Sequence, residues 1–142
     1  MTTDLKNLIR RIPEELYNQG NLAAADELFH ADYIEHRPLP PNFPKGAGIP
    51  KTMAALMRKA FPDLHMTIED VLADGDKAVV RLTVQGTHVG EFMGLPATGR
   101  RITWTETHIA RYENGKVAEH WMNVDELGRL QQLGAVPEPA AA

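Results

Sequence analysis

The stretch "ITWTETHIARYENGKVAEHWMN", from Ile102 to Asn123, contains two strand-like runs on either side of a turn. Apolar residues recur at every second position in both runs, and this period is typical of β-strands with one buried face. Three positions that should share the buried face are nevertheless polar: Glu106, His108 and His120. Whether these side chains meet one another or face water decides most of what the sequence says about function.

The register of this hairpin depends on how its turn closes. A two-residue turn at Asn114–Gly115 would be of type I′, which favours this dipeptide. It would pair Glu113 with Lys116 and set His108 opposite Trp121. The two histidines would then point to opposite sides of the sheet.

A three-residue loop, with Gly115 in the left-handed conformation, gives another register. The opposing pairs are then Tyr112 and Lys116, His108 and His120, Glu106 and Met122, and Ala110 and Ala118. This register separates apolar from polar residues more cleanly, because a slip of one residue moves one strand's side chains to the other face. Ile109 and Trp121 are the apolar exceptions on the other face. We therefore predict the three-residue loop, with Glu106 and both histidines on one apolar face.

Convergent polar groups on an apolar face are typical of a small-molecule pocket. Glu106 is the candidate general base, and His108 and His120 are candidates to orient it and to stabilise oxyanion charge. The same residues are also compatible with a hydrogen-bonded core that has no catalytic role. Two histidines and a carboxylate match a facial-triad metal site as well. Side chains paired on neighbouring strands often simply hydrogen-bond, so we predict no metal.

The rest of the chain predicts helices first and strands afterwards. Helical spacing covers 4–18, with a kink at Pro13, then a short segment around 22–28, 51–61 and finally 125–133. Strand patterns cover 32–36, 64–73 and 77–88, and the stretches 37–50 and 89–99 read as loops. This order predicts a single α+β domain over 1–142, with helices on one face of a curved antiparallel sheet. We expect a frayed tail at 135–142.

Composition excludes several classes of protein. The chain has 142 residues, of which 43% are hydrophobic and 24% are charged, as in ordinary globular domains. A formal charge of −4 gives no reason to expect nucleic acid or a membrane as a partner. No signal peptide or spanning segment is visible, and we expect a cytoplasmic protein. The absence of cysteine and serine excludes thiolate and serine nucleophiles, and no phosphate-loop or HExxH pattern occurs.

Other residues are weaker candidates for the pocket. His36 precedes a proline-rich loop and His88 ends a strand, so each is placed either at the pocket or on the surface. Trp104 and Met122 fit the pocket wall or the core. Asp125 fits the N-cap of the last helix.

Beyond these patterns, the chain resembles a known family. The stretches "FHADYIEH" (29–36), "HVGEFMGLPATGRR" (88–101) and "DELGRLQQLG" (125–134) are similar to those of SnoaL-like polyketide cyclases and predicted ester cyclases, within the NTF2-like superfamily. The resemblance covers nearly the whole chain. It implies a cone of helices on a strongly curved antiparallel sheet that encloses a pocket.

The resemblance also implies a function. Cyclases of this family close a ring by an intramolecular aldol reaction without metal or cofactor. Their acid/base aspartate lies two residues after the histidine that matches His120, and here that position is Met122. We therefore expect acid/base chemistry on a hydrophobic, carbonyl-bearing small molecule, with Glu106 as the base. Ligand binding without turnover, and a hydroxylase or hydrolase activity, are the alternatives. The apolar pair Ile109 and Trp121 predicts a homodimer interface.

Overall fold

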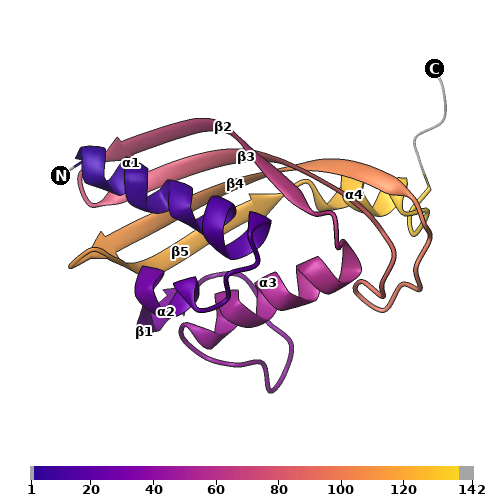
Figure 1. Cartoon of the computed structure of the whole chain (residues 1–142), viewed down its shortest axis with the longest axis horizontal. Coiled ribbons are helices and arrows are strands. Elements are labelled where there is room, and N and C mark those ends of the chain that lie inside the picture. The colour runs from indigo at the N-terminus through magenta and orange to yellow at the C-terminus, as the bar shows by residue number, and fades with distance from the viewer. Residues whose placement is uncertain (1, 138–142) are drawn as a thin grey trace.

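The computed structural model describes residues 2–137. Along this part of the chain the elements are α1 (Thr2–Arg11), the π-helical segment η1 (Ile12–Asn18), α2 (Ala24–Leu28), β1 (Phe29–Glu35), α3 (Gly48–Ala60), β2 (His65–Asp74), β3 (Lys77–Thr87), β4 (Arg101–Glu113), β5 (Lys116–Val124) and α4 (Glu126–Gln132). The helices that precede β2 in the chain, α1, η1, α2 and α3, cover one face of the sheet (Figure 1). The α+β cone is confirmed.

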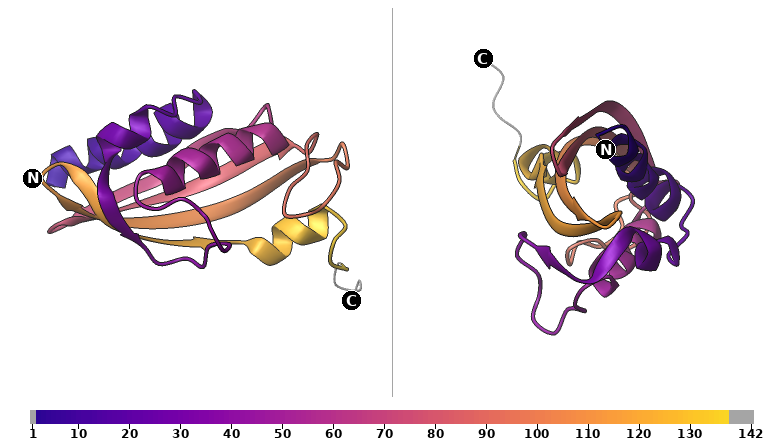
Figure 2. Two further views of the ribbon diagram at one scale, coloured as in Figure 1. Left: turned by 90° about the horizontal axis from the view of Figure 1, so that it is seen from below. Right: turned by 90° about the vertical axis from the view of Figure 1, so that its left-hand side faces the viewer.

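The five strands form one sheet in the order β1-β5-β4-β3-β2. Strands β2 to β5 run antiparallel, as predicted, but β1 pairs with β5 in parallel. The sheet is therefore mixed rather than purely antiparallel. The end-on view in Figure 2 shows it curling around α1, and α1 packs on β2 and β3. The hydrophobic core lies inside this curve.

Most predicted boundaries hold within a few residues. Pro13 marks the place where α1 gives way to η1, because proline cannot donate the backbone hydrogen bond of a helix interior. The predicted loop 37–50 is wrong at its end, since α3 already begins at Gly48. Pro50 sits in the first turn of α3, where its missing N–H removes no helical hydrogen bond. Residues 138–142 of the predicted frayed tail lie outside the described residues.

The turn of the β4–β5 hairpin is the two-residue one, so the predicted three-residue loop is wrong. Asn114 and Gly115 have φ values of 50° and 79°, and Glu113 pairs with Lys116. Two consecutive positive φ values are the mark of a type I′ turn, whose twist matches that of the flanking strands. The turn chemistry of Asn-Gly therefore prevailed over the hydrophobic pattern.

A β-bulge then restores the predicted faces. Arg111 pairs with Glu119 and Tyr112 pairs with Val117, so Ala118 is an extra residue in β5. Beyond it the pairs are Ala110 with His120, His108 with Met122, and Glu106 with Val124. Beyond the bulge each predicted pair is displaced by two residues, which preserves the face of each side chain, whereas Tyr112, before the bulge, is displaced by one. Glu106, His108 and His120 thus share the concave face, as predicted.

Candidate active site

Glu106 lies on the concave face and is only 5% exposed. Its two carboxylate oxygens have different partners. Oε1 lies 2.8 Å from Nε2 of His108, and Oε2 accepts a hydrogen bond of 2.7 Å from Nε1–H of Trp104. Alternation along β4 aligns these three side chains, because residues two apart in a strand point to the same face.

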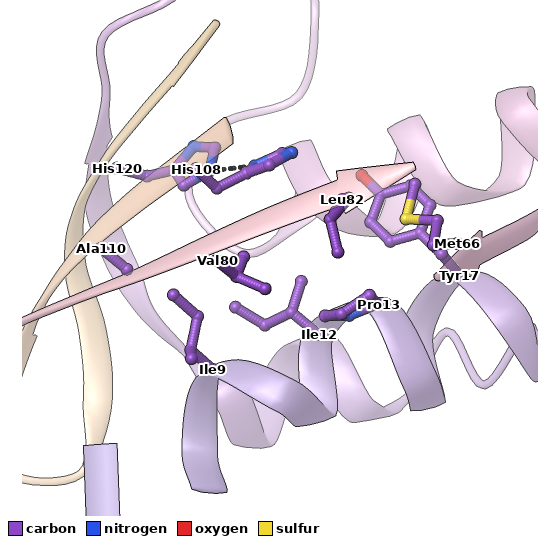
Figure 3. A pocket seen from close by; sticks show the side chains of 10 residues that line it. All are labelled: Ile9, Ile12, Pro13, Tyr17, Met66, Val80, Leu82, His108, Ala110 and His120. Carbon is purple, nitrogen blue, oxygen red and sulfur yellow. Dashed lines mark hydrogen bonds between the residues drawn. The ribbon is translucent and has the colours of Figure 1, made fainter. Parts of the chain in front are cut away.

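The second histidine extends this contact into a chain. Nδ1 of His108 lies 2.9 Å from Nε2 of His120, and Figure 3 shows the two rings joined at the sheet surface. Nδ1 of His120 in turn lies 2.8 Å from Oε1 of Glu35, on the neighbouring strand β1. The hydroxyl of Tyr33 also donates to Glu35, at 3.1 Å. Sequence reasoning missed Glu35, because nothing in the sequence announces the parallel pairing of β1 with β5.

Burial and the neighbouring groups act in opposite directions on the carboxylates. Burial by itself would raise the pKa of Glu106, but its bonds to His108 and Trp104 and the charge of Arg129 outweigh this effect and lower it. The pKa of Glu35 is lowered for the same kind of reason, with His120 as the main opposing partner. For His120 burial prevails, and its pKa is lowered despite the contact with Glu35. Both carboxylates are therefore ionised at neutral pH.

A cavity of about 640 Å³ adjoins this chain. Glu106, His108 and Met122 contribute to its wall from the sheet. Most of the remaining lining is apolar, and five methionines take part: Met53, Met57, Met66, Met93 and Met122. The volume suits a small molecule of several rings. Methionine side chains adapt their shape easily, so this wall accommodates ligands of different outline.

A second, much smaller void lies behind the histidines (Figure 3). Its volume is about 10 Å³, near the lower limit for one water molecule. Ile9, Ile12 and Pro13 cover it from the helical side, and Val80 and Ala110 from the sheet. The histidine pair is thus enclosed by apolar groups on the side away from the large cavity.

Cationic side chains also reach the large cavity. Arg129 of α4 is 7% exposed, pairs with Glu126, and lies over the rings of Phe92 and Trp104 at 4.8 and 5.1 Å. These cation–π contacts and the ion pair with Glu126 hold the guanidinium in place. The ion pair uses Nε and Nη2, so Nη1 makes no bond to Glu126. Nε of Arg37 is buried and has no hydrogen-bond partner within residues 2–137. Both guanidinium groups are placed to receive negative charge on a ligand.

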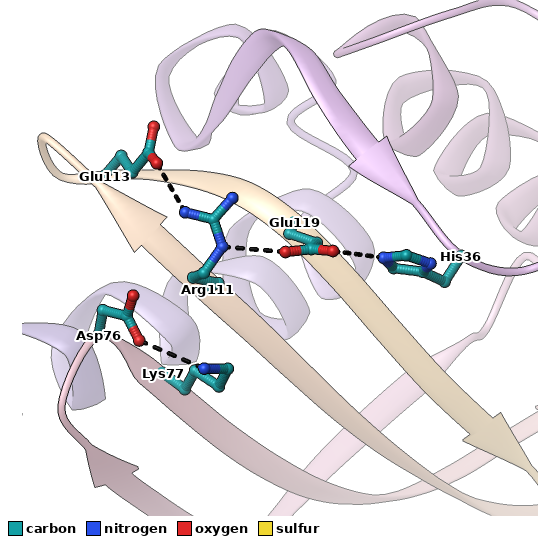
Figure 4. A network of polar contacts seen from close by, with 6 residues as sticks. All are labelled: His36, Asp76, Lys77, Arg111, Glu113 and Glu119. Atoms are coloured by element: carbon teal, nitrogen blue, oxygen red, sulfur yellow. Dashed lines mark hydrogen bonds and ion pairs between the residues drawn. The ribbon is translucent and has the colours of Figure 1, made fainter.

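Two predicted pocket residues lie elsewhere. His36 is on the convex side of the sheet, where it bonds Glu119 at 2.6 Å (Figure 4). Its ring also stacks on that of Trp121. His88 is fully buried beside Phe61, and its Nδ1 contacts Thr98. Neither residue lines the large cavity. The side chain of His36 points to the convex side because successive side chains of an extended strand alternate in direction, and that of the preceding residue, Glu35, points inward.

The other predicted residues lie at the site. Trp104 is buried in the wall behind Glu106, and Met122 lines the cavity. Asp125 caps α4, as predicted, by accepting a hydrogen bond from the backbone N–H of Gly128. No group of three or more His, Cys, Asp or Glu side chains suited to a metal ion occurs in the part of the chain described. None of the helices described has the length and apolar character needed to cross a membrane.

Comparison with known proteins identifies the family. The family model for SnoaL-like polyketide cyclases matches residues 7–133. The chain is 33% identical to the aklanonic acid methyl ester cyclase of Streptomyces peucetius over 138 residues, which cover 94% of this chain and 92% of that protein. It is 32% identical to the nogalonic acid methyl ester cyclase of Streptomyces nogalater, over 83% of this chain and 89% of the other. The chain therefore belongs to the SnoaL-like polyketide cyclase family.

Solved structures agree with this assignment. TsrD from Streptomyces laurentii superimposes with a TM-score of 0.82 at 32% identity, covering 94% of this chain and 97% of the other. AclR from Streptomyces galilaeus, proposed to be a hydroxylase, gives a TM-score of 0.84 at 26% identity, covering 99% and 87%. The family assignment made from the sequence is confirmed.

Proposed function

We propose that the protein is a cyclase that uses Glu106 as a general base on a hydrophobic, carbonyl-bearing small molecule, without a cofactor. The observation that carries this proposal is the position of the Glu106 carboxylate, which is ionised and held by two hydrogen bonds in the wall of a largely apolar cavity. The names of the relatives support methyl esters such as aklanonic acid methyl ester as the first substrates to test.

The proposed reaction is an intramolecular aldol closure. Glu106 takes the proton from a carbon next to a carbonyl, and that carbon bonds to a second carbonyl carbon of the same molecule. The second carbonyl oxygen becomes an alkoxide and receives a proton, which Glu106 returns. The product is an isomer of the substrate, so its mass is unchanged.

The geometry changes the proposed role of the histidines. Both ring nitrogens of His108 and His120 are engaged within the chain of contacts, so neither ring has a free N–H for a substrate oxygen. We propose that they orient Glu106 and set its charge. Arg37 and Arg129 are better placed to stabilise an enolate or alkoxide oxygen in the cavity.

Met122 supports a second candidate function, binding without turnover. The resemblance to the family's cyclases implies that their acid/base aspartate corresponds to this position, and a thioether transfers no proton. A chain that kept the pocket but lost this group would bind the same hydrophobic molecules and release them unchanged.

The test is turnover of aklanonic acid methyl ester by purified protein, followed by chromatography and mass spectrometry. We expect a cyclised isomer, and a loss of about 10²–10⁴-fold in the rate for Glu106→Gln. Glu91→Gln is the matched control, since Glu91 lines the same cavity but lies outside the chain of contacts. In the Glu106→Gln background, Met122→Asp should restore part of the activity.

Other outcomes separate the alternatives. Binding without conversion, equal in wild type and Glu106→Gln, would favour the binding protein. A product that gains an oxygen atom would favour a hydroxylase. Full turnover by Glu106→Gln would exclude Glu106 as the base.

A further inference from the structure

Three short contacts join four side chains in a row. They run from Glu35 to His120, from His120 to His108 at 2.9 Å, and from His108 to Glu106 at 2.8 Å. In the first contact both carboxylate oxygens of Glu35 face the same Nδ1 of His120, at 2.8 and 2.9 Å, so one proton serves both. Each contact joins two atoms that are acceptors when they carry no proton. Two lone pairs facing each other at such a distance repel, so each contact needs one proton.

Counting protons gives the charge of the row. Three contacts need three protons, whereas two neutral imidazoles and two carboxylates supply only two. The third proton makes one of the two rings an imidazolium. We propose that Glu35, His120, His108 and Glu106 act as one acid–base unit with three protons and a net charge of −1, in which Glu35 is the positioning residue that retains the third proton.

The distribution of this charge follows from the surroundings. We place the imidazolium charge on His108, because its Nε2 contacts the Glu106 carboxylate at the large cavity. Burial lowers the pKa of His120. The other ionisable groups facing the unit are Tyr17 from η1, Tyr33 and Arg37 on either side of Glu35, and Arg129 from α4. Burial raises the pKa of Tyr17 to about 12, so it stays neutral. In the absence of substrate, the positive charges of Arg37 and Arg129 disfavour a fourth proton on the unit.

The two ends of the unit lie at different cavities. Glu106 lines the large cavity, whereas Glu35 lines a separate, more open cleft of about 620 Å³ beneath residues 39–46. Leu39, Pro40 and Phe43 separate the two, because they contribute to both linings. A proton that enters the unit at Glu106 therefore has an exit that does not pass through the substrate.

In turnover this arrangement supports the proposed base, and this part of the inference rests on the proposed function. When Glu106 takes a proton from substrate carbon, His108 loses its anionic partner. The proton between the rings then moves from Nδ1 of His108 to Nε2 of His120, and the proton on Nδ1 of His120 moves to Glu35. All four groups end neutral, so no uncompensated charge remains buried. The reverse movement restores the unit when Glu106 gives up its proton.

The proton count is tested without any substrate, by ¹⁵N NMR of histidine-labelled protein. At pH 7 we expect three of the four ring nitrogens of His108 and His120 to carry protons. In Glu35→Gln the pair should lose its third proton at a pH lower by about one unit or more, because an adjacent charge is removed. Glu35→Asp should partly restore the wild-type titration.

Glu119→Gln is the matched control. Glu119 contacts a histidine on the same sheet, but that histidine is His36 on the convex side. This variant should change the signals of His36 and leave those of His108 and His120 as in wild type. Only two protonated nitrogens in the wild-type pair would overturn the proposed unit, even if Glu35→Gln failed to fold. An unchanged titration in folded Glu35→Gln would remove Glu35 from it.

The same variant separates the two proposals. Absence of turnover on every substrate would contradict the proposed function but would leave the NMR result intact. Where turnover is found, Glu35→Gln should shift the basic limb of the pH–rate profile to lower pH, whereas loss of a purely structural contact would lower the rate equally at all pH values.

Discussion

Replacing Trp104 by phenylalanine tests how the carboxylate at the centre of the site is held. The indole is 2% exposed, and its Nε1–H is the donor to Oε2 of Glu106 at 2.7 Å. Phenylalanine keeps an aromatic ring against Phe61, whose centroid lies 5.4 Å from that of Trp104, but it removes the donor. Within the described residues, Trp104 is the one side chain that donates to Oε2 of Glu106, so the substitution leaves this oxygen without its protein donor.

The expected size of the effect follows from the charge of the acceptor. A hydrogen bond to a charged group contributes about 1.5–3 kcal/mol to stability, and a neutral one about 0.5–1.5 kcal/mol. The smaller ring also leaves space, which adds an independent loss. In a double-mutant cycle with Glu106→Gln, the loss caused by the smaller ring occurs in both backgrounds and cancels. Glutamine accepts the same bond without charge, so the coupling free energy is the difference between the charged and the neutral hydrogen bond. We expect a coupling free energy of about 1 kcal/mol from urea unfolding at pH 7, followed by circular dichroism.

The pH dependence provides a second check. The pKa of Glu106 in the folded protein is lowered, so its contribution to stability is present above the unfolded value of about 4.3 and is lost as pH falls through the folded value. Trp104→Phe raises the folded pKa toward the ordinary one. The stability difference between variant and wild type should therefore narrow below about pH 4. A coupling near zero, or a difference that stays constant from about pH 7 to 3.5, would refute the proposed role of the indole.

Two further predictions concern the backbone and the assembly. Gly75→Ala should reduce the free energy of unfolding by about 1–2 kcal/mol, and Gly46→Ala by several times as much, as measured by urea unfolding. The reason is that a Cβ at Gly46 would clash with the carbonyl oxygen of Ala31, whereas nothing lies within 4 Å of a Cβ at Gly75. Equal losses would show that the close approach at Gly46 relaxes freely. Ile109 and Trp121 are paired and half-buried on the convex face, and we expect a homodimer there that Ile109→Lys dissociates, as measured by light scattering. A wild-type monomer at micromolar concentration would contradict this expectation.

Hydrophobic alternation predicted the faces of the sheet more reliably than its register. The buried side chains of β4 follow the predicted period of two, from Ile102 through Glu106 to Ala110. The predicted three-residue turn was wrong because both registers compared assumed regular pairing along the whole hairpin. Neither of them contained a β-bulge. An extra residue in β5 reconciles the Asn-Gly turn with the predicted faces.

Contacts that depend on the pairing of strands far apart in the chain could not be predicted from the sequence. The alternation of "DYIEH" places Tyr33 and Glu35 on one face, but only the parallel pairing with β5 brings Glu35 to His120. In α4, the apolar Leu127 is 58% exposed while the charged Arg129 is buried. Stacking on Phe92 and Trp104 gives Arg129 an apolar environment that helical spacing alone does not indicate.

The position of His120 depends on irregular pairing at both edges of one short segment of β5. On the β4 side, the extra residue Ala118 turns the following side chains over, and both Val117 and Ala118 are buried as a result. On the β1 side, the register advances from Phe29 opposite Val117 to Ile34 opposite Glu119, so β1 also carries extra residues there. Without the first irregularity, the regular register from the Asn-Gly turn would direct His120 to the convex face. Without the second, Glu35 would not stand beside it. The geometry of the site therefore depends on residues that have no chemical role in it. The small side chain of Ala118 allows two successive residues, Val117 and Ala118, to point into the core.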